Sequence, residues 1–149
     1  MNKKIVFSIA AFSFFSLVII SCGEDETISK PVITIEELGV DNSHIGTRGE
    51  EFHVEAEVTA EGRIASIEII IHQEEEGEDE KSTKADEAWE YDSIYTEGFI
   101  GFKNATFHQH IEVPSDILTG EYHFHFIVND QDGYQTMVEE EIEIQSSGE

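Results

Sequence analysis

The residues whose type and spacing indicate chemistry in this 149-residue sequence are its histidines. There are seven of them: His44, His53, His72, His108, His110, His123 and His125. Four form two His-x-His pairs, at 108/110 and at 123/125. Imidazole nitrogens are preferred ligands of zinc, copper, nickel and iron, whereas calcium prefers oxygen. The pairs therefore predict binding of a Zn, Cu, Ni or Fe ion, provided that the fold brings the imidazoles together.

Both pairs lie in segments that alternate between apolar and polar residues. Phe107–Ile111 reads FHQHI, and Tyr122–Phe126 reads YHFHF. In a β-strand, residues i and i+2 project from the same face with Cα atoms about 6.5 to 7 Å apart. Each pair is therefore expected to project from one face of its strand, while the apolar neighbours point into the core.

The elements that must position the histidines are short alternating segments, typical of an all-β domain. The predicted strands cover residues 32–37, 52–59, 64–72, 89–95, 104–113, 120–129 and 137–144. About seven such strands require two packed sheets, because one sheet could not cover so many apolar faces. We predict an immunoglobulin-like β-sandwich over residues 31–145, and residues 116–124 resemble the tyrosine corner of such folds, with Tyr122 near the start of a strand.

Strand order decides which histidines meet. In an immunoglobulin-like order the second strand pairs with the fifth, and the third with the sixth. This order predicts two trios, one on each outer face: His53, His108 and His110, and His72, His123 and His125. If the fifth and sixth strands instead form a hairpin, four histidines converge on one site.

A simpler interpretation is that the histidines are tolerated polar residues on the wet faces of strands. Their partners would then be nearby carboxylates, namely Glu55, Glu57, Glu68 or Glu112. Two His-x-His pairs with two further in-phase histidines favour a ligand site instead. The acidic surroundings favour protonated imidazoles, so we expect metal affinity to fall as the pH drops through histidine titration, with the loss displaced toward higher pH. The sequence has no His-Glu-x-x-His motif and no general base at a telling spacing, so we predict no enzyme activity.

The turn before the last predicted strand carries a weaker calcium signal. Asp130, Asp132, Gly133 and Glu139 occupy positions three, five, six and twelve of an EF-hand loop. Position one is Val128, which cannot ligate, and the flanking segments are strands. An ordinary hairpin turn is the favoured interpretation.

The charge balance excludes one class of partner and predicts a solvated loop. The chain has 33 acidic and 8 basic side chains, a formal net charge of −25. A nucleic-acid-binding protein needs a basic footprint, which this sequence lacks, so we predict no nucleic-acid partner. Residues 73–87 contain a block of like charges that cannot pack, and we predict an acidic loop there.

The N-terminal residues have the layout of a secretory signal: Lys3 and Lys4 precede a mostly apolar run over residues 5–20. The sequence Ile19-Ile20-Ser21-Cys22 resembles the lipobox of bacterial lipoproteins. The resemblance implies a signal peptide over residues 1–21, lipidation of Cys22 and an acidic tether over residues 22–30. The acyl chains would hold the protein in a membrane.

Two further resemblances concern location and family. Residues 23–26, GEDE, resemble the acidic tag of Bacteroidetes-type lipoproteins, which implies an outer-membrane protein facing the cell exterior. The chain from residue 30 onward resembles a domain of unknown function, number 4625, found in such lipoproteins. That resemblance rests on residues 30–33, 37–39, 49–60, 64–72, 103–104, 107–111, 114, 120–124 and 132–149. The family implies the fold and the location but no activity.

The sequence thus predicts a surface-exposed lipoprotein whose strand histidines hold a transition-metal ion. The alternative is an adhesion or scaffold module of an outer-membrane complex that binds no metal. The expected partners are the membrane, through the lipid anchor, and either a metal ion or an outer-membrane protein.

Replacement of the lipid-accepting thiol tests the predicted anchor. The Cys22→Ser variant should not be lipidated and should leave the membrane fraction, because the acyl chains are the expected anchor after the signal is removed. Cell fractionation with an acyl label measures both effects. A wild-type protein that takes up no label while remaining in the membrane would contradict the lipobox interpretation.

Overall fold

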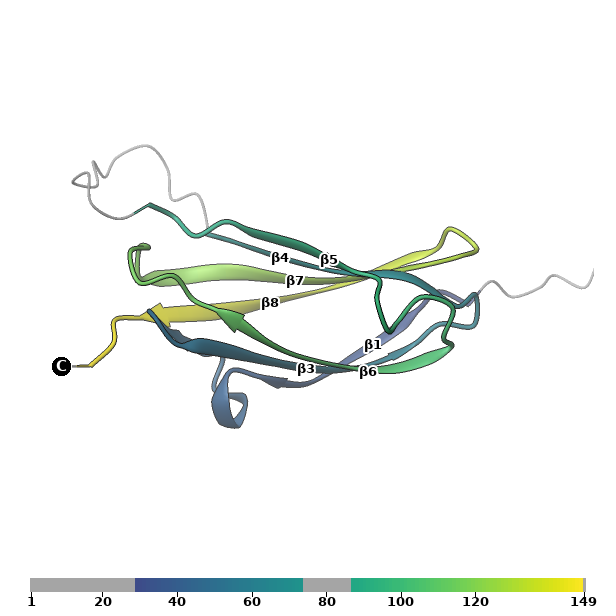
Figure 1. Cartoon of the computed structure of the whole chain (residues 1–149), viewed down its shortest axis with the longest axis horizontal. Helices are drawn as coiled ribbons and strands as arrows, with labels where there is room; N and C mark the ends of the chain where they lie inside the picture. The colour runs from purple at the N-terminus through teal and green to yellow at the C-terminus, as the bar shows by residue number, and fades with distance from the viewer. Residues whose placement is uncertain (1–28, 74–86, 149) are drawn as a thin grey trace, which may run out of the picture.

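The computed structural model describes residues 29–73 and 87–148, which form two β-sheets packed face to face (Figure 1). The smaller sheet has the order β1-β3-β6 and is antiparallel throughout. Its strands are β1 (Val32–Leu38), β3 (Glu51–Thr59) and β6 (Asn104–Glu112). A short 3₁₀ segment, η1 (Val40–Asn42), follows β1.

The larger sheet has the order β2-β8-β7-β4-β5. Its strands are β2 (Ile45–Thr47), β8 (Gln135–Gln145), β7 (Gly120–Asp130), β4 (Ile64–Gln73) and β5 (Tyr91–Tyr95). The β2–β8 pair is parallel and the other pairs are antiparallel. Figure 1 shows this sheet lying over the layer formed by β1, β3 and β6.

The predicted immunoglobulin-like sandwich is confirmed, and so is the strand order on which the two histidine trios depend. Strand β3 pairs with β6, and β4 pairs with β7. The alternative hairpin between the fifth and sixth predicted strands is wrong, because β6 and β7 lie in different sheets. The described residues hold eight strands rather than about seven, since the three-residue β2 is too short to show an alternating pattern.

The core determines which side chains of each strand point inward between the two sheets. In β3 the side chains of Phe52, Val54, Ala56 and Val58 are all buried, as the alternation predicts. Aromatic rings cross between the two sheets: Phe107 of β6 and Phe126 of β7 lie 5.1 Å apart at their centroids, at 88°. Such edge-to-face pairs add about 0.5–1.5 kcal/mol beyond the burial of their area. Side chains of the opposite parity are therefore held on the outer faces.

Tyr122 makes the predicted tyrosine corner. Its hydroxyl donates to the carbonyl of Leu118 at 2.8 Å and accepts from the backbone N–H of Trp89 at 3.2 Å. The side chain is buried, and this burial raises the pKa of the Tyr122 hydroxyl. One residue thus ties the start of β7 to the segment preceding β5.

Several predictions lie outside the described residues. These are the signal peptide over residues 1–21, the lipidated Cys22, most of the tether and the acidic block over residues 74–86. At the far edge of that block, Glu87 forms a parallel bridge with Ile117. Among the residues that the structure describes, no helix has the length and apolar character needed to cross a membrane.

Removal of the Tyr122 hydroxyl tests the tyrosine corner. The Tyr122→Phe variant should lower the free energy of unfolding by about 1–3 kcal/mol, because it leaves the Leu118 carbonyl and the Trp89 N–H without their partner. Urea unfolding measures the change. The control is Tyr134→Phe, at a half-buried position, which should stay within about 0.5 kcal/mol of wild type. Equal effects of the two substitutions would contradict a special role for Tyr122.

Candidate metal centres

The pairing of β3 with β6 assembles the first histidine cluster, which we define as His53, His108 and His110. His53 stands directly opposite His110, and His108 stands two residues along the same strand. Their neighbours Phe52, Phe107 and Ile111 are buried. Strand alternation therefore directs all three imidazoles to the outer face of the smaller sheet.

The three rings of the first cluster lie in mutual contact. Ring centroids are 4.8 Å apart for His53 and His108, 5.0 Å for His53 and His110, and 5.3 Å for the pair on β6. Each histidine offers one nitrogen such that all three nitrogens lie within 4.8 Å of one another. Tetrahedral zinc, with Zn–N bonds of about 2.0–2.1 Å, needs its nitrogens about 3.3 Å apart. Small side-chain rotations would bring the three imidazoles onto one ion.

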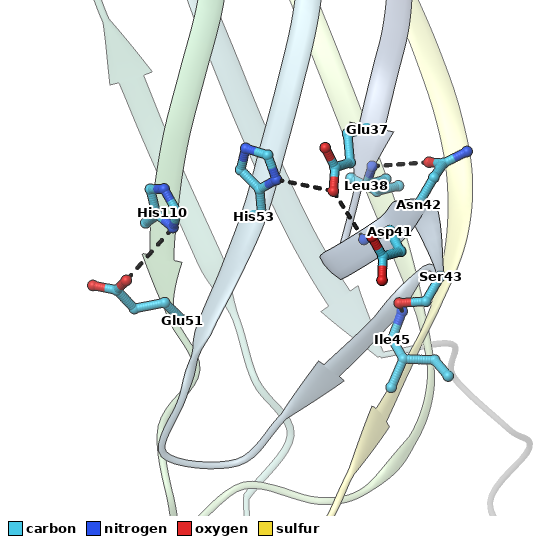
Figure 2. A network of polar contacts seen from close by, with 9 residues as sticks. All are labelled: Glu37, Leu38, Asp41, Asn42, Ser43, Ile45, Glu51, His53 and His110. Carbon is cyan, nitrogen blue, oxygen red and sulfur yellow. Dashed lines mark hydrogen bonds and ion pairs between the residues drawn. The ribbon is translucent and has the colours of Figure 1, made fainter.

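Carboxylates lie beside two of these imidazoles (Figure 2). Nδ1 of His53 lies 3.4 Å from Oε1 of Glu37, and Nδ1 of His110 lies 3.5 Å from Oε2 of Glu51. Nε2 of His53 is buried and has no hydrogen-bond partner among the described residues. A metal-ligating histidine commonly gives its other ring N–H to a carboxylate. His53 therefore has the arrangement of a ligand, with Nδ1 held and Nε2 available.

His53 also belongs to a mixed group with two carboxylates. One atom each of Glu37, His53 and Glu55 lie within 4.8 Å of one another. The exposed fractions differ across the cluster: the His53 side chain is 15% exposed, whereas that of His110 is 51% exposed. The cluster thus combines a sheltered central imidazole with ligands that are open to solvent.

The pairing of β4 with β7 assembles the second histidine cluster, defined as His72, His123 and His125. His72 stands directly opposite His123, on the outer face of the larger sheet. The closest approach is between Nε2 of His72 and Nε2 of His125, at 3.0 Å. Two neutral imidazoles at this distance share one N–H, and a metal ion can take the place of that proton.

One carboxylate, that of Glu139, lies beside two imidazoles of the second cluster. Oε1 of Glu139 lies 3.3 Å from Nδ1 of His123, and its Oε2 lies 3.8 Å from Nδ1 of His125. Glu139 stands opposite His125 in the register of β7 and β8. A carboxylate therefore lies beside the imidazoles on the second face as well. Of the two clusters, only the first brings one nitrogen from each of its three rings within 4.8 Å of the others.

Comparison with known proteins identifies the family. Residues 20–145 match the family described as domain of unknown function DUF4625. The chain belongs to this family. The resemblance of the sequence to this domain of unknown function is confirmed, and no curated protein matches the chain. Since DUF4625 carries no described activity, any function for this DUF4625 chain has to be argued from its geometry.

The structure places all six predicted site residues of the DUF4625 domain in the two trios, but the carboxylate partners differ from the expected ones. The carboxylate contacts that it gives use Glu37, Glu51 and Glu139, which the sequence did not single out as partners of the histidines. Of the expected carboxylates, Glu55 lies in the group around His53. Glu139 stands opposite His125 because β7 and β8 form a hairpin with this register. Counting outward from the predicted turn between these two strands could have identified Glu139 as the partner.

The seventh histidine of the DUF4625 domain lies outside both clusters. Nδ1 of His44 is 3.2 Å from the backbone oxygen of Glu141, and the side chain lines a shallow depression with residues 139–141. The backbone of His44 has a left-handed φ of 58°. Because His44 belongs to neither cluster, it provides a control position for substitutions of the clustered histidines.

Burial lowers the pKa of His125, because desolvation outweighs the attraction of Glu139 for the charged ring. His72 and His123, when charged, lower that pKa further. The expectation that the acidic surroundings raise imidazole pKa values is therefore wrong for His125. A neutral imidazole is the form that binds metal, so the burial favours ligation by His125.

Titration of the metal-free protein tests this direction. His125 should remain neutral below the ordinary histidine pKa of about 6.5. Its pKa should fall further in Glu139→Gln and rise toward the ordinary value in His72→Asn. Between about pH 6.5 and the lower pKa of His125 in the folded state, the unfolded chain binds more protons at His125 than the folded chain does. The free energy of unfolding should therefore fall as the pH drops from about 6.5 toward that lower pKa. Ring proton chemical shifts measured by NMR give the values, and a His125 pKa above the ordinary one would contradict the analysis.

Proposed function

We propose that this chain is a surface-exposed, lipid-anchored binding module that holds a transition-metal ion through its outward-facing histidines. One observation carries the proposal: His53, His108 and His110 offer three nitrogens within 4.8 Å of one another. Nε2 of His53 supports it, because this nitrogen is buried without a hydrogen-bond partner among the described residues while Nδ1 lies 3.4 Å from Oε1 of Glu37. Imidazole ligation suits Zn, Cu, Ni or Fe.

The proposal is binding without turnover. Three histidines leave a fourth coordination position to solvent, but the sequence has no general base at a telling spacing beside them. His110 lies half exposed on the open face of a sheet, so the ion would be reached directly from solution. The net charge of −25 raises the local concentration of cations around such a site.

The second cluster would hold a second ion on the opposite face. The 3.0 Å approach of His72 and His125 suits two ligands of one ion, and the Glu139 carboxylate lies beside both His123 and His125. The core separates the two faces, so we expect the two clusters to bind independently. The predicted lipid on Cys22 and the acidic tag after it would place both sites outside the cell.

Calorimetry with Zn²⁺, Cu²⁺ and Ni²⁺ tests the proposal. Wild type should bind two equivalents of at least one of these ions. The double variants His108→Ala/His110→Ala and His123→Ala/His125→Ala should each lose one equivalent, because the single imidazole that remains in the altered cluster cannot chelate an ion. Glu37→Gln should weaken the first site about 10- to 100-fold, since it removes only the charge that orients His53.

The matched control is His44→Asn, which removes the one histidine outside both clusters. Asparagine tolerates the left-handed backbone at this position. This variant should bind both equivalents. If wild type binds no transition metal at micromolar concentration, or if neither double variant loses an equivalent, the metal proposal is wrong.

Failure of the metal proposal would favour the adhesion or scaffold module. One observation supports that alternative: Ile100 and Phe102, between β5 and β6, are each 57% exposed. Exposed apolar side chains of this size are suited to contact with another protein.

A further inference from the structure

Two turns meet at one end of the sandwich, away from the proposed function's histidines. The turn between β3 and β4 contains Gly62 and Arg63, and the turn between β7 and β8 follows Asp130, the last residue of β7. The backbone N–H of Gln131 donates to the carbonyl of Arg63 at 2.8 Å, which holds the two turns together. The carboxylates of the second turn are thereby brought against the first.

Asp130 is the one buried charged side chain among the described residues, with an exposed fraction of 4%. Its Oδ1 accepts from the backbone N–H of Tyr134 at 2.7 Å, as expected for an aspartate in a hairpin turn. Its Oδ2 is also buried, yet no described group donates a hydrogen bond to it. A buried carboxylate oxygen needs a donor or a cation, because its charge is otherwise desolvated without compensation.

A second carboxylate points at the same place. A Cβ atom on Gly62 would lie 2.6 Å from Oδ2 of Asp130 and 2.7 Å from Oδ2 of Asp132. The two oxygens therefore lie no farther apart than the sum of those distances. Like charges at this separation repel, and the absence of a side chain at Gly62 is what leaves them room.

We propose that Asp130 and Asp132 form a site for a hard divalent cation of the calcium class, held against Gly62 by the Oδ2 atoms of both carboxylates. Calcium takes oxygen ligands at about 2.3–2.6 Å, a range that two oxygens in this arrangement can satisfy together. Water and turn carbonyls would complete its shell. With only two charged ligands, we expect a Kd on the order of 10⁻⁴–10⁻³ M, the range of extracellular calcium modules.

The site differs from the EF-hand-like pattern in the sequence and from the histidine clusters. Glu139, at the last position of that pattern, contacts the second histidine cluster instead. The oxygen-only ligands also select against the imidazole-preferring metals. A cation here would tie the β3–β4 turn to the β7–β8 turn and stabilise this end of the sandwich.

Thermal unfolding of the purified protein, in EDTA and in calcium, tests the site. At a calcium concentration tenfold above the Kd, the wild-type Tm should rise by about 3–8 °C. The rise should disappear in Asp130→Asn and also in Asp132→Asn, whose exposed position allows the substitution without loss of the fold. It should also disappear in Gly62→Ala, whose methyl group fills the space between the carboxylates.

The control for the acidic surface is Asp92→Asn, which removes one exposed carboxylate from β5 and should keep the full rise. If Asp132→Asn keeps the rise as well, calcium binds diffusely and the proposal is wrong. If calcium does not change the Tm of wild type, the proposal is also wrong. The His108→Ala/His110→Ala variant should keep the calcium effect, so failure of one proposal is distinguishable from failure of the other.

Discussion

Burial of every second side chain between the two sheets is the constraint on which the rest of the structure depends. Phe52, Phe107 and Phe126 face inward and their rings fill the space between the layers. A shift of one residue in any of these strands would expose its apolar set and bury its imidazoles. The cost of that exchange holds the histidines outward, so the hydrophobic core, rather than any contact among the imidazoles, determines where they point.

Cross-strand register then turns outward-facing residues into clusters. His53 meets His110, and His72 meets His123, because the antiparallel pairs β3–β6 and β4–β7 place them directly opposite one another. The next strand on each sheet adds a carboxylate: Glu37 comes from β1 and Glu139 from β8. The same construction therefore appears on two faces that share no residue, which explains why the two clusters can be tested separately.

Local desolvation, rather than the net charge of −25, determines the behaviour of individual groups. His125 lies among acidic residues, yet burial lowers its pKa. Asp130 lies in an acidic chain, yet one of its carboxylate oxygens is buried without a donor among the described residues. Over a distance of a few ångströms, loss of water outweighs the diffuse field of a solvated surface. Both groups are consequently suited to a cation, the imidazole through its neutral form and the carboxylate through its uncompensated charge.

Local alternation in the sequence was sufficient to predict seven of the eight described strands, their inner faces and the outward direction of the His-x-His pairs, because the side-chain period of a strand is encoded residue by residue. The sequence left two strand pairings open: the immunoglobulin-like order, and a hairpin between the fifth and sixth predicted strands. The placement of β6 and β7 in different sheets decided between them. Strand β2, the carboxylates of Glu37 and Glu139, and the meeting of Gly62 with Asp130 and Asp132 could not be predicted. Each of these depends on contacts between segments far apart in the chain, and such contacts are decided by packing of the whole core rather than by any local pattern of residues.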